Sequence, residues 1–236
     1  MAKKLSTRYN KGTTLELGGI HISIHNIRSK LLGTAAILFL VIGLVLVIYP
    51  KWSQYNEYQR ELRLLTEWGD FPAATVSSYP LTTSSEPSSR PTNTFSPKII
   101  DGHAVYGTVN IPKIDLREPM VEGATQESLK LGSGIVVPDR MPGEVGNFVL
   151  ASHRSLTFGR HYNRLDELEV GDSIDLETSD QIHTYTVESK FIVTPDDLSV
   201  LEQNEEDSEL TLITCEPIDT ATHRLIVKAK MEKKTN

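Results

Sequence analysis

A run of 19 residues without a charged side chain, from Leu31 to Tyr49, divides this chain into two very different parts. As an α-helix that rises about 1.5 Å per residue, the run spans about 28 Å, close to the hydrocarbon thickness of a bilayer. We therefore expect residues 31–49 to form a single transmembrane helix. A cleaved signal peptide fits less well, because the run is long for one and because bulky residues, Tyr49 to Trp52, follow it.

The charges on either side of this run predict its orientation. Six lysines and arginines precede it, whereas only one acidic residue does, so the positive-inside rule places residues 1–30 in the cytoplasm as an N-terminal tail. The rest of the chain is then extracellular, and the protein crosses the cell membrane once. Residues 99–236 carry 13 basic and 25 acidic residues, a net charge of −12, which argues against a nucleic-acid partner because phosphates require a basic surface.

Two segments connect the predicted span to the folded part. Residues 50–68 repeat large apolar side chains at three- and four-residue intervals, which predicts a juxtamembrane helix with an apolar stripe at Tyr55, Tyr58, Leu62 and Leu65. From residue 69 to residue 98, 17 of 30 residues are Ser, Thr or Pro and four are charged, which is typical of a polar linker stiffened by proline. We expect the folded domain over residues 99–236.

Short β-type segments separated by turn residues recur along this domain. The predicted strands cover residues 105–111, 114–121, 148–153, 173–177, 183–193, 209–214 and 224–230. Helical turns are predicted over residues 125–131 and 163–168, a dense turn cluster over 138–147 and an acidic loop over 194–207. About eight short strands with hardly any helix predict an all-β sandwich or barrel.

The only cysteine of the chain, Cys215, stands at the end of a predicted strand, and Pro217 stops that strand. Arg224 opens the next predicted strand, nine positions after the cysteine, with Leu225, Val227 and Ala229 on one face. Two adjacent antiparallel strands would hold the thiol and the guanidinium near the same end of a sheet. There a cation favours the thiolate and can stabilise an oxyanion. The alternative is a buried cysteine that acts as a small hydrophobe.

Five histidines lie on the predicted extracellular side and are candidates for a base beside the thiol: His103, His153, His161, His183 and His223. His153 ends a predicted strand next to a turn-rich region, where a catalytic group gains access to substrate. His183 and His223 lie next to strand interiors, where a satisfied or solvent-facing imidazole is the usual case. Spacing alone favours His153 only slightly.

The residues Thr211 to Cys215, TLITC, resemble the TLxTC signature on the catalytic strand of sortases, the membrane-anchored cysteine transpeptidases of bacterial surfaces. His153 lies 62 positions upstream in Ala-Ser-His-Arg, which is similar to the histidine motif of that family, and Arg224 in Arg-Leu-Ile-Val matches its arginine strand. The resemblance covers roughly residues 104–230. The stretches TCEPIDTATHRLIV and RSLTFGRHYNRLDELEVGD are most similar to the class D and class E branches.

This resemblance implies an eight-stranded β-barrel and a set of residue roles. Cys215 would attack the Thr-Gly bond of an LPxTG-like sorting signal and form a thioacyl enzyme. His153 would protonate the departing glycine amine and later deprotonate an incoming amine, and Arg224 would stabilise the oxyanion. Thr214 would shape the site, and Ser152 stands at its edge, where many relatives have Gly. The implied partners are surface proteins with C-terminal sorting signals and a peptidoglycan precursor or another amine acceptor.

Three alternatives stay open beside cell-wall anchoring: a pilin-polymerising sortase, a non-catalytic barrel that binds sorting signals, and a plain cysteine peptidase. An Asp-Pro-aromatic lid motif and a second membrane segment after Arg224, both typical of pilin polymerases, are not found in the sequence. Anchoring is therefore preferred. An intact set of Cys215, His153 and Arg224 argues against a pure binding module.

We expect no cofactor and no metal ion, with calcium as the alternative. Carboxylates gather in and beside the predicted acidic loop, and hard oxygen ligands suit calcium. Their spacing is not that of a known calcium loop, so a solvated acidic loop is the preferred interpretation. These residues are Asp196, Asp197, Glu202, Glu205, Glu206, Asp207 and Glu209.

Overall fold

The computed structural model describes residues 14–17, 20–69, 96–157 and 160–232, with side chains from residue 32 onward. Most of the predicted linker, residues 70–95, lies outside the described residues, as do parts of the predicted cytoplasmic tail. Within the described part the chain forms two compact units, residues 1–55 and residues 56–236.

One long helix, α1 (Ile24–Gly69), covers both the predicted membrane span and the predicted juxtamembrane helix. It continues through Pro50, which lacks the backbone N–H that would bond the preceding turn. In the described part of the chain, this helix alone is long and apolar enough to cross a membrane. Its division at residue 50 into a membrane part and a juxtamembrane part stays a prediction. A hairpin of β1 (Thr14–Leu17) and β2 (Ile20–Ser23) precedes the helix and has no counterpart in the sequence prediction.

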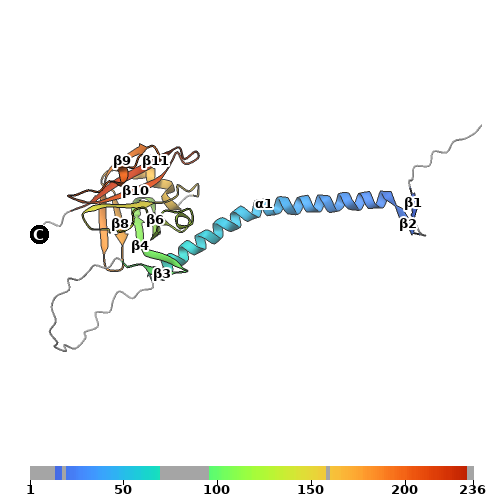
Figure 1. Cartoon of the computed structure of the whole chain (residues 1–236), viewed down its shortest axis with the longest axis horizontal. Helices are drawn as coiled ribbons and strands as arrows, with labels where there is room; N and C mark the ends of the chain where they lie inside the picture. Colours follow the sequence, from blue (N-terminus) through green and yellow to red (C-terminus); the bar gives the residue numbers. More distant parts are fainter. Residues whose placement is uncertain (1–13, 18–19, 70–95, 158–159, 233–236) are drawn as a thin grey trace, which may run out of the picture. The chain divides into compact units, whose positions relative to one another are not determined.

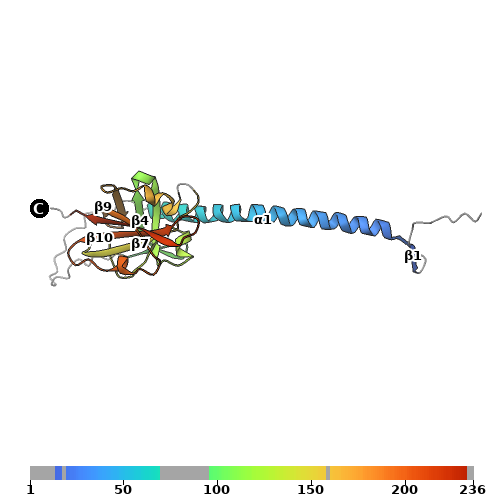
Figure 2. The ribbon, with the colours of Figure 1, turned by 90° about the horizontal axis from the view of Figure 1, so that it is seen from above.

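The second unit contains a closed β-barrel of eight strands (Figures 1 and 2). Neighbouring strands follow the order β4-β5-β6-β7-β10-β11-β9-β8, and pairing of β4 with β8 closes the ring, while β3 pairs with β4 only. The strands are β3 (Lys98–Ile100), β4 (His103–Ile111), β5 (Leu116–Glu122), β6 (Ser133–Ile135), β7 (Gly146–Ala151), β8 (Ser173–Glu177), β9 (Ile182–Val193), β10 (Ser208–Glu216) and β11 (His223–Met231). The prediction of an eight-stranded barrel is therefore confirmed.

Four short 3₁₀ turns connect these strands: η1 (Pro112–Ile114), η2 (Ser128–Lys130), η3 (His161–Glu167) and η4 (Ser199–Leu201). Two of them lie where helical turns were predicted, over residues 125–131 and 163–168. The strand predicted over residues 114–121 begins later, at Leu116, because Pro112 starts a 3₁₀ turn and has no N–H for the sheet.

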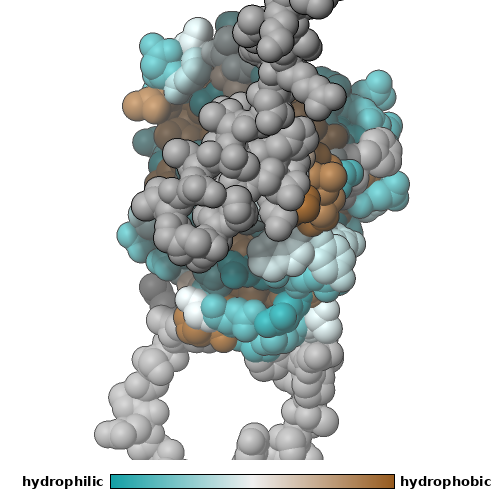
Figure 3. Space-filling model, turned by 90° about the vertical axis from the view of Figure 1, so that its right-hand side faces the viewer, coloured by the Kyte–Doolittle hydropathy of each residue, from teal (hydrophilic) through white to brown (hydrophobic). Residues whose placement is uncertain are grey.

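The barrel interior is filled by the alternating apolar side chains of the strands. The predicted inward face of β11, with Leu225, Val227 and Ala229, is buried in this core and is confirmed. From the neighbouring strand β10, Leu210 and Leu212 are fully buried in the same cluster. Burial of each of these leucine and valine side chains contributes roughly 1.5–3 kcal/mol. Hydrophilic side chains line much of the outer margin of the face drawn in Figure 3.

The end of α1 packs on the barrel with a face other than the predicted one. Tyr55 and Tyr58 of the predicted stripe are 63% and 40% exposed. Instead Leu64 and Trp68 are buried in a second cluster with Ile100, Val105, Val121 and Leu131, and Glu61 shares their face at 5% exposure. The positions 61, 64 and 68 follow the i, i+3, i+7 spacing of one helix face. The sequence prediction missed this face because a glutamate stands in it.

Candidate active site

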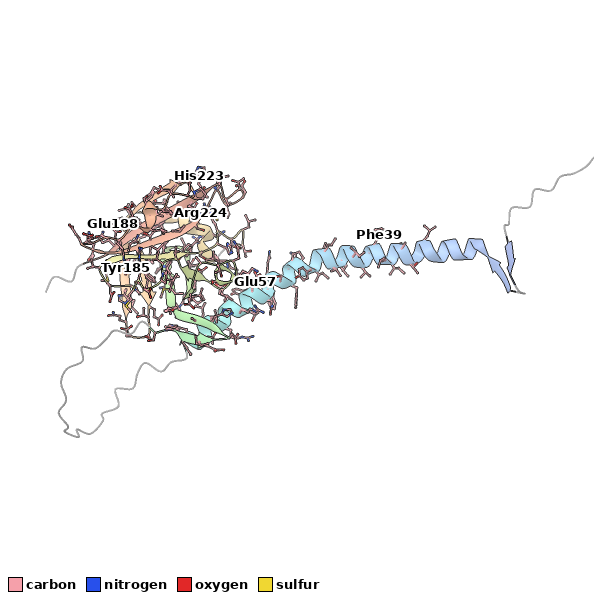
Figure 4. All side chains as sticks on the ribbon, viewed as in Figure 1. Phe39, Glu57, Tyr185, Glu188, His223 and Arg224 are labelled. Atoms are coloured by element: carbon pink, nitrogen blue, oxygen red, sulfur yellow. The ribbon has the colours of Figure 1, made fainter. Side chains whose placement is uncertain are left out.

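Strands β10 and β11 bring Cys215 and Arg224 together. The two strands are antiparallel, and their register pairs Cys215 directly with Arg224. Both residues are half-buried. Nη1 of Arg224 donates hydrogen bonds to the carbonyl of Ala221 at 3.1 Å and to that of His223 at 2.9 Å, which anchors the guanidinium to the loop between the strands. Figure 4 shows Arg224 and His223 on β11. The predicted antiparallel pairing of the two strands is confirmed, and the roles of Cys215 and Arg224 stay a prediction.

His153 reaches the same end of the barrel through a parallel pairing of β7 with β10. That register ends with Ala151 opposite Ile213, and His153 follows two residues after the end of β7. Two hydrogen bonds hold the chain here: the Ser152 N–H donates to the Ile213 carbonyl at 3.1 Å, and Oγ1 of Thr214 donates to the Ser152 carbonyl at 2.9 Å. Thr214 is 2% exposed, so this second bond is shielded from water. The residues preceding the histidine and the cysteine are thus bonded to each other.

Arg154 adds a further link between the two segments. Its guanidinium forms an ion pair with Glu216, the residue after Cys215, and another with Asp166 at 2.9 Å. The Arg154 side chain is 8% exposed, and ion pairs shielded in this way are stronger than those on an open surface. Arg154 belongs to the histidine motif Ala-Ser-His-Arg, and the motif alone predicted no role for it.

Behind His153 lies a buried polar cluster centred on Glu118 of β5. Glu118 is fully buried and accepts hydrogen bonds from the hydroxyls of Ser133 at 2.8 Å and Ser152 at 3.1 Å. Its other oxygen lies 2.9 Å from Nδ1 of His161. The rings of His161 and His153 meet edge to face with their centroids 6.2 Å apart. The Ser152 hydroxyl, expected at the edge of the site, therefore points to this cluster.

The two histidines have opposite pKa shifts. Burial lowers the pKa of His153 below its usual value, and the positive charge of His161 lowers it further. Burial alone would also lower the pKa of His161, but the hydrogen bond and the negative charge of Glu118 outweigh it and raise this pKa. At neutral pH His153 is therefore mainly neutral and able to accept a proton, while His161 is the more readily protonated member of the pair.

Two groups of acidic residues bear on metal binding. Of the predicted acidic loop, Asp207 and Glu209 form ion pairs with Lys230 and Lys228. Among the described residues, the group whose donor atoms lie close enough to share an ion is a different one: Glu61, Glu118 and His161, within 4.8 Å of one another. Arg160 donates to Glu61 at 3.0 Å, so a cation already lies against this group.

Glu118 and His161 were missed as site residues, and only Glu118 carries a signal in the sequence. In β5 the side chains of Leu116, Glu118 and Met120 share one face, because successive strand residues alternate. Leu116 and Met120 belong to the main core, so a carboxylate between them needs a buried partner. His161 stands in a loop with no periodic pattern, and nothing local distinguishes it from the other histidines.

Two cavities in the described part of the protein lie away from these three residues. One of about 600 Å³ is lined by α1 residues, Asp101, His103 and Leu131, and another of about 420 Å³ by Tyr106, Ile135 and the segment 138–141. Neither is lined by Cys215, His153 or Arg224.

Comparison with known proteins gives one consistent family. Sortase D of Bacillus subtilis is 36% identical over 127 residues, which cover 52% of this chain and 62% of that protein. Sortase SrtE1 of Streptomyces coelicolor is 34% identical over 142 residues, covering 53% of this chain and 40% of that protein. A solved structure of a Clostridium perfringens Sortase D5 transpeptidase is 33% identical with a TM-score of 0.51, covering 58% of this chain and 83% of that one.

The family match falls on the part of the chain that carries the site. The chain spans 53% of a Streptococcus agalactiae Sortase A and 62% of the Bacillus subtilis Sortase D, so it matches less than two thirds of these relatives. The Sortase domain model matches residues 109–232, which contain Cys215, His153 and Arg224 and more than half of the chain. The chain belongs to the sortase family.

Proposed function

We propose that this protein is a membrane-anchored cysteine transpeptidase that cleaves an LPxTG-like sorting signal between Thr and Gly and joins the new carboxyl group to a cell-wall amine. The observation that carries this proposal is the pairing of Cys215 with Arg224 across β10 and β11, with His153 two residues beyond the end of β7, the parallel neighbour of β10. An acyl transfer needs a nucleophile, a proton carrier and a charge stabiliser, and these residues supply one each.

In the acylation step, Sγ of Cys215 attacks the carbonyl carbon of the threonine while His153 takes the thiol proton. Arg224 stabilises the negative charge that develops on the carbonyl oxygen. When the C–N bond breaks, His153 returns the proton to the glycine amine, and a thioester remains on Cys215. His153 then takes a proton from the incoming amine as it attacks the thioester, and this proton goes back to the sulfur as the thiol leaves.

The resting state of His153 fits the first step. Its lowered pKa keeps the imidazole neutral at neutral pH, so it is ready to accept the thiol proton. The hydrogen bonds that tie Ser152 to β10 fix the backbone beside His153, and fixed positioning of a catalytic group lowers the barrier without further chemistry.

The membrane arrangement is part of the same proposal. Residues 31–49 anchor the chain, the N-terminus is cytoplasmic, and the barrel meets surface proteins and a peptidoglycan precursor outside the cell. The positive charges before the span support this orientation. A solved Clostridium perfringens sortase C carries a C-terminal cell-wall sorting motif in its structure, and it is 28% identical to this chain with a TM-score of 0.50. That relation supports a sorting signal as the substrate class.

A pilin-joining activity is the second candidate. The structure of Streptococcus pneumoniae Sortase C, described for its pilin substrate specificity, is 32% identical to this chain with a TM-score of 0.51. The two candidates differ in the amine that attacks the thioester: a lysine side chain of a pilin or an amine of a cell-wall precursor.

The test incubates the full chain, in detergent micelles, with quenched LPxTG, LAxTG and NPxTG peptides and excess amine, followed by mass spectrometry of the products. One arm offers a wall-type amine and another a pilin peptide with a lysine. We expect a threonine–amine adduct with the wall-type amine, and no adduct with Cys215→Ala. Release of free acid alone, with abundant amine present, would favour the peptidase, and preference for the lysine would favour the pilin activity.

A further inference from the structure

We infer that the end of α1 nearest the barrel is part of the catalytic apparatus: Glu61, together with Glu118, holds His161 behind His153, and the three are positioning residues for the proton carrier. This inference goes beyond the family assignment and rests on the proposed role of His153. It concerns the end of a helix whose predicted role is to anchor the chain in the membrane.

The first observation is a carboxylate in an apolar helix face. Glu61 is 5% exposed and shares its face with Leu64 and Trp68, which pack in the second core cluster. An ionised carboxylate in such a place costs several kcal/mol unless it is paired. An apolar residue at this position would extend the apolar contact of the helix. The burial of the Glu61 carboxylate is therefore explained only by its polar partners on the barrel.

The second observation is the partner. Nη2 of Arg160 donates to Glu61 at 3.0 Å, and the two side chains are 12% and 6% exposed. The same Nη2 lies 3.4 Å from Nε2 of His161, and the Arg160 guanidinium stands 5.4 Å from the ring centroid of Tyr58, also on α1. The helix thus holds Arg160 by an ion pair and a cation–π contact.

The third observation is how these contacts fix the chain next to His153. His161 adopts a left-handed backbone conformation, with φ of 52°, which costs a side-chain-bearing residue energy and persists where neighbours impose it. Its Nδ1 meets Glu118, and the next residue, Tyr162, donates its N–H to the His153 carbonyl at 2.9 Å. The backbone of His153 is therefore bonded to the start of η3, where Glu61 holds Arg160 and Glu118 holds His161.

The cluster has as many acidic as basic groups. Glu61 and Glu118 are the two acidic groups, and Arg160 and His161 are the two basic groups. Burial and the charge of Glu118 raise the pKa of Glu61, and the hydrogen bond to Glu118 raises that of His161. A metal on Glu61, Glu118 and His161 would have to displace the imidazolium proton and lie close to the Arg160 guanidinium. The geometry therefore favours a balanced ion cluster over a metal centre.

The cluster faces His153 from several elements. The charged groups that act on His153 are Glu57 of α1, Glu118 of β5, Lys130 of η2 and His161 of η3. Glu57 stands one helical turn before Glu61 and is labelled in Figure 4. The end of α1 therefore acts on His153 in two ways, through the charge of Glu57 and through the Glu61–Arg160–His161 chain of contacts.

The test compares Glu61→Gln with Arg63→Gln in the full chain. Arg63 also bonds the barrel from α1, at 3.1 Å to Asp101, but that pair is 57% and 42% exposed, so its variant is a matched control. We expect Glu61→Gln to lower kcat for peptide transfer about tenfold to a hundredfold with little change in KM, because the proton carrier is misplaced while the substrate contacts remain. Arg63→Gln keeps both constants.

A second readout needs no substrate. In Glu61→Gln, the pKa of His153 measured by NMR titration should rise. His161 then holds its proton less firmly, so its positive charge opposes protonation of His153 less. If Glu61→Gln does not fold, Glu61→Asp replaces it, because it keeps the carboxylate on a shorter side chain. The changes in kcat and in the pKa of His153 should then have the same direction and be smaller. A folded Glu61 variant with the wild-type His153 titration and kcat would overturn the inference. If the wild-type protein forms no threonine–amine adduct, the proposed function is overturned instead. The NMR titration of His153 then remains the test of this inference.

Discussion

Replacing His161 by Gln removes the positive charge that most lowers the pKa of His153, the proposed proton carrier. The two rings lie 6.2 Å apart, and unit charges at this distance interact by about 0.7 kcal/mol at a dielectric constant of about 80 and by about 2.7 kcal/mol at about 20. At about 1.4 kcal/mol per pKa unit, this is about half a unit to two units. His153 is half-buried, so the shift should fall between these limits.

The sign of the effect follows from the charge that is lost. The imidazolium of His161 disfavours a second proton on His153, so its removal raises the pKa of His153. The negative charge of Glu118 favours the protonated form of His153. In the variant this charge remains, while the opposing positive charge of His161 is gone. The limb of the pH–rate profile that reports the pKa of His153 should therefore move to higher pH as well.

The assay is NMR titration of labelled histidine rings in wild type and in His161→Gln. His183→Gln is the control, because His183 lies ten residues before Val193, the β-sheet partner of Arg224, and thus about 30 Å away along β9. The control should leave the His153 titration unchanged. An unchanged or lowered pKa of His153 in folded His161→Gln would refute the electrostatic coupling of the two rings.

Three further variants test the barrel and the site. Leu212→Ala should lower the free energy of unfolding by about 2–5 kcal/mol in urea, because it opens a cavity in the barrel core; a loss below 1 kcal/mol would contradict its burial. Arg154→Gln should cost about 2 kcal/mol by the same measurement, since it leaves Glu216 without its cation, and unchanged stability would show that the link is not formed. Arg224→Gln should lower kcat about a hundredfold with the fold intact by circular dichroism, and a wild-type rate would exclude Arg224 from oxyanion stabilisation.

Local patterns explain why the cysteine strand could be predicted from the sequence. β10 and β11 alternate apolar and polar residues and are joined by a short loop, so their antiparallel pairing and the meeting of Cys215 with Arg224 follow from neighbouring residues alone. The position of His153 depends on the parallel pairing of β7 with β10, which joins segments 62 residues apart. No local pattern encodes such a pairing, and only the resemblance to sortases singled out His153.

Physical reasons also explain why other features could not be predicted from the sequence. β3 and β6 have three residues each, too few for an alternation to stand out. The buried face of α1 was misassigned because Glu61 interrupts its apolar stripe, and the cation that compensates it, Arg160, is far away in the sequence. The polar cluster behind His153 combines residues of α1, β5, β6 and η3, and its members meet only in the folded barrel.

The most direct test of the central claim is intact-protein mass spectrometry of the full chain after brief incubation with an LPxTG peptide and no added amine. The account predicts a mass increase equal to the peptide up to its threonine, located on Cys215, removed by a nucleophilic amine and missing in Cys215→Ala. Peptide binding without this adduct, or an adduct on another residue, would contradict the assignment of Cys215 as the nucleophile.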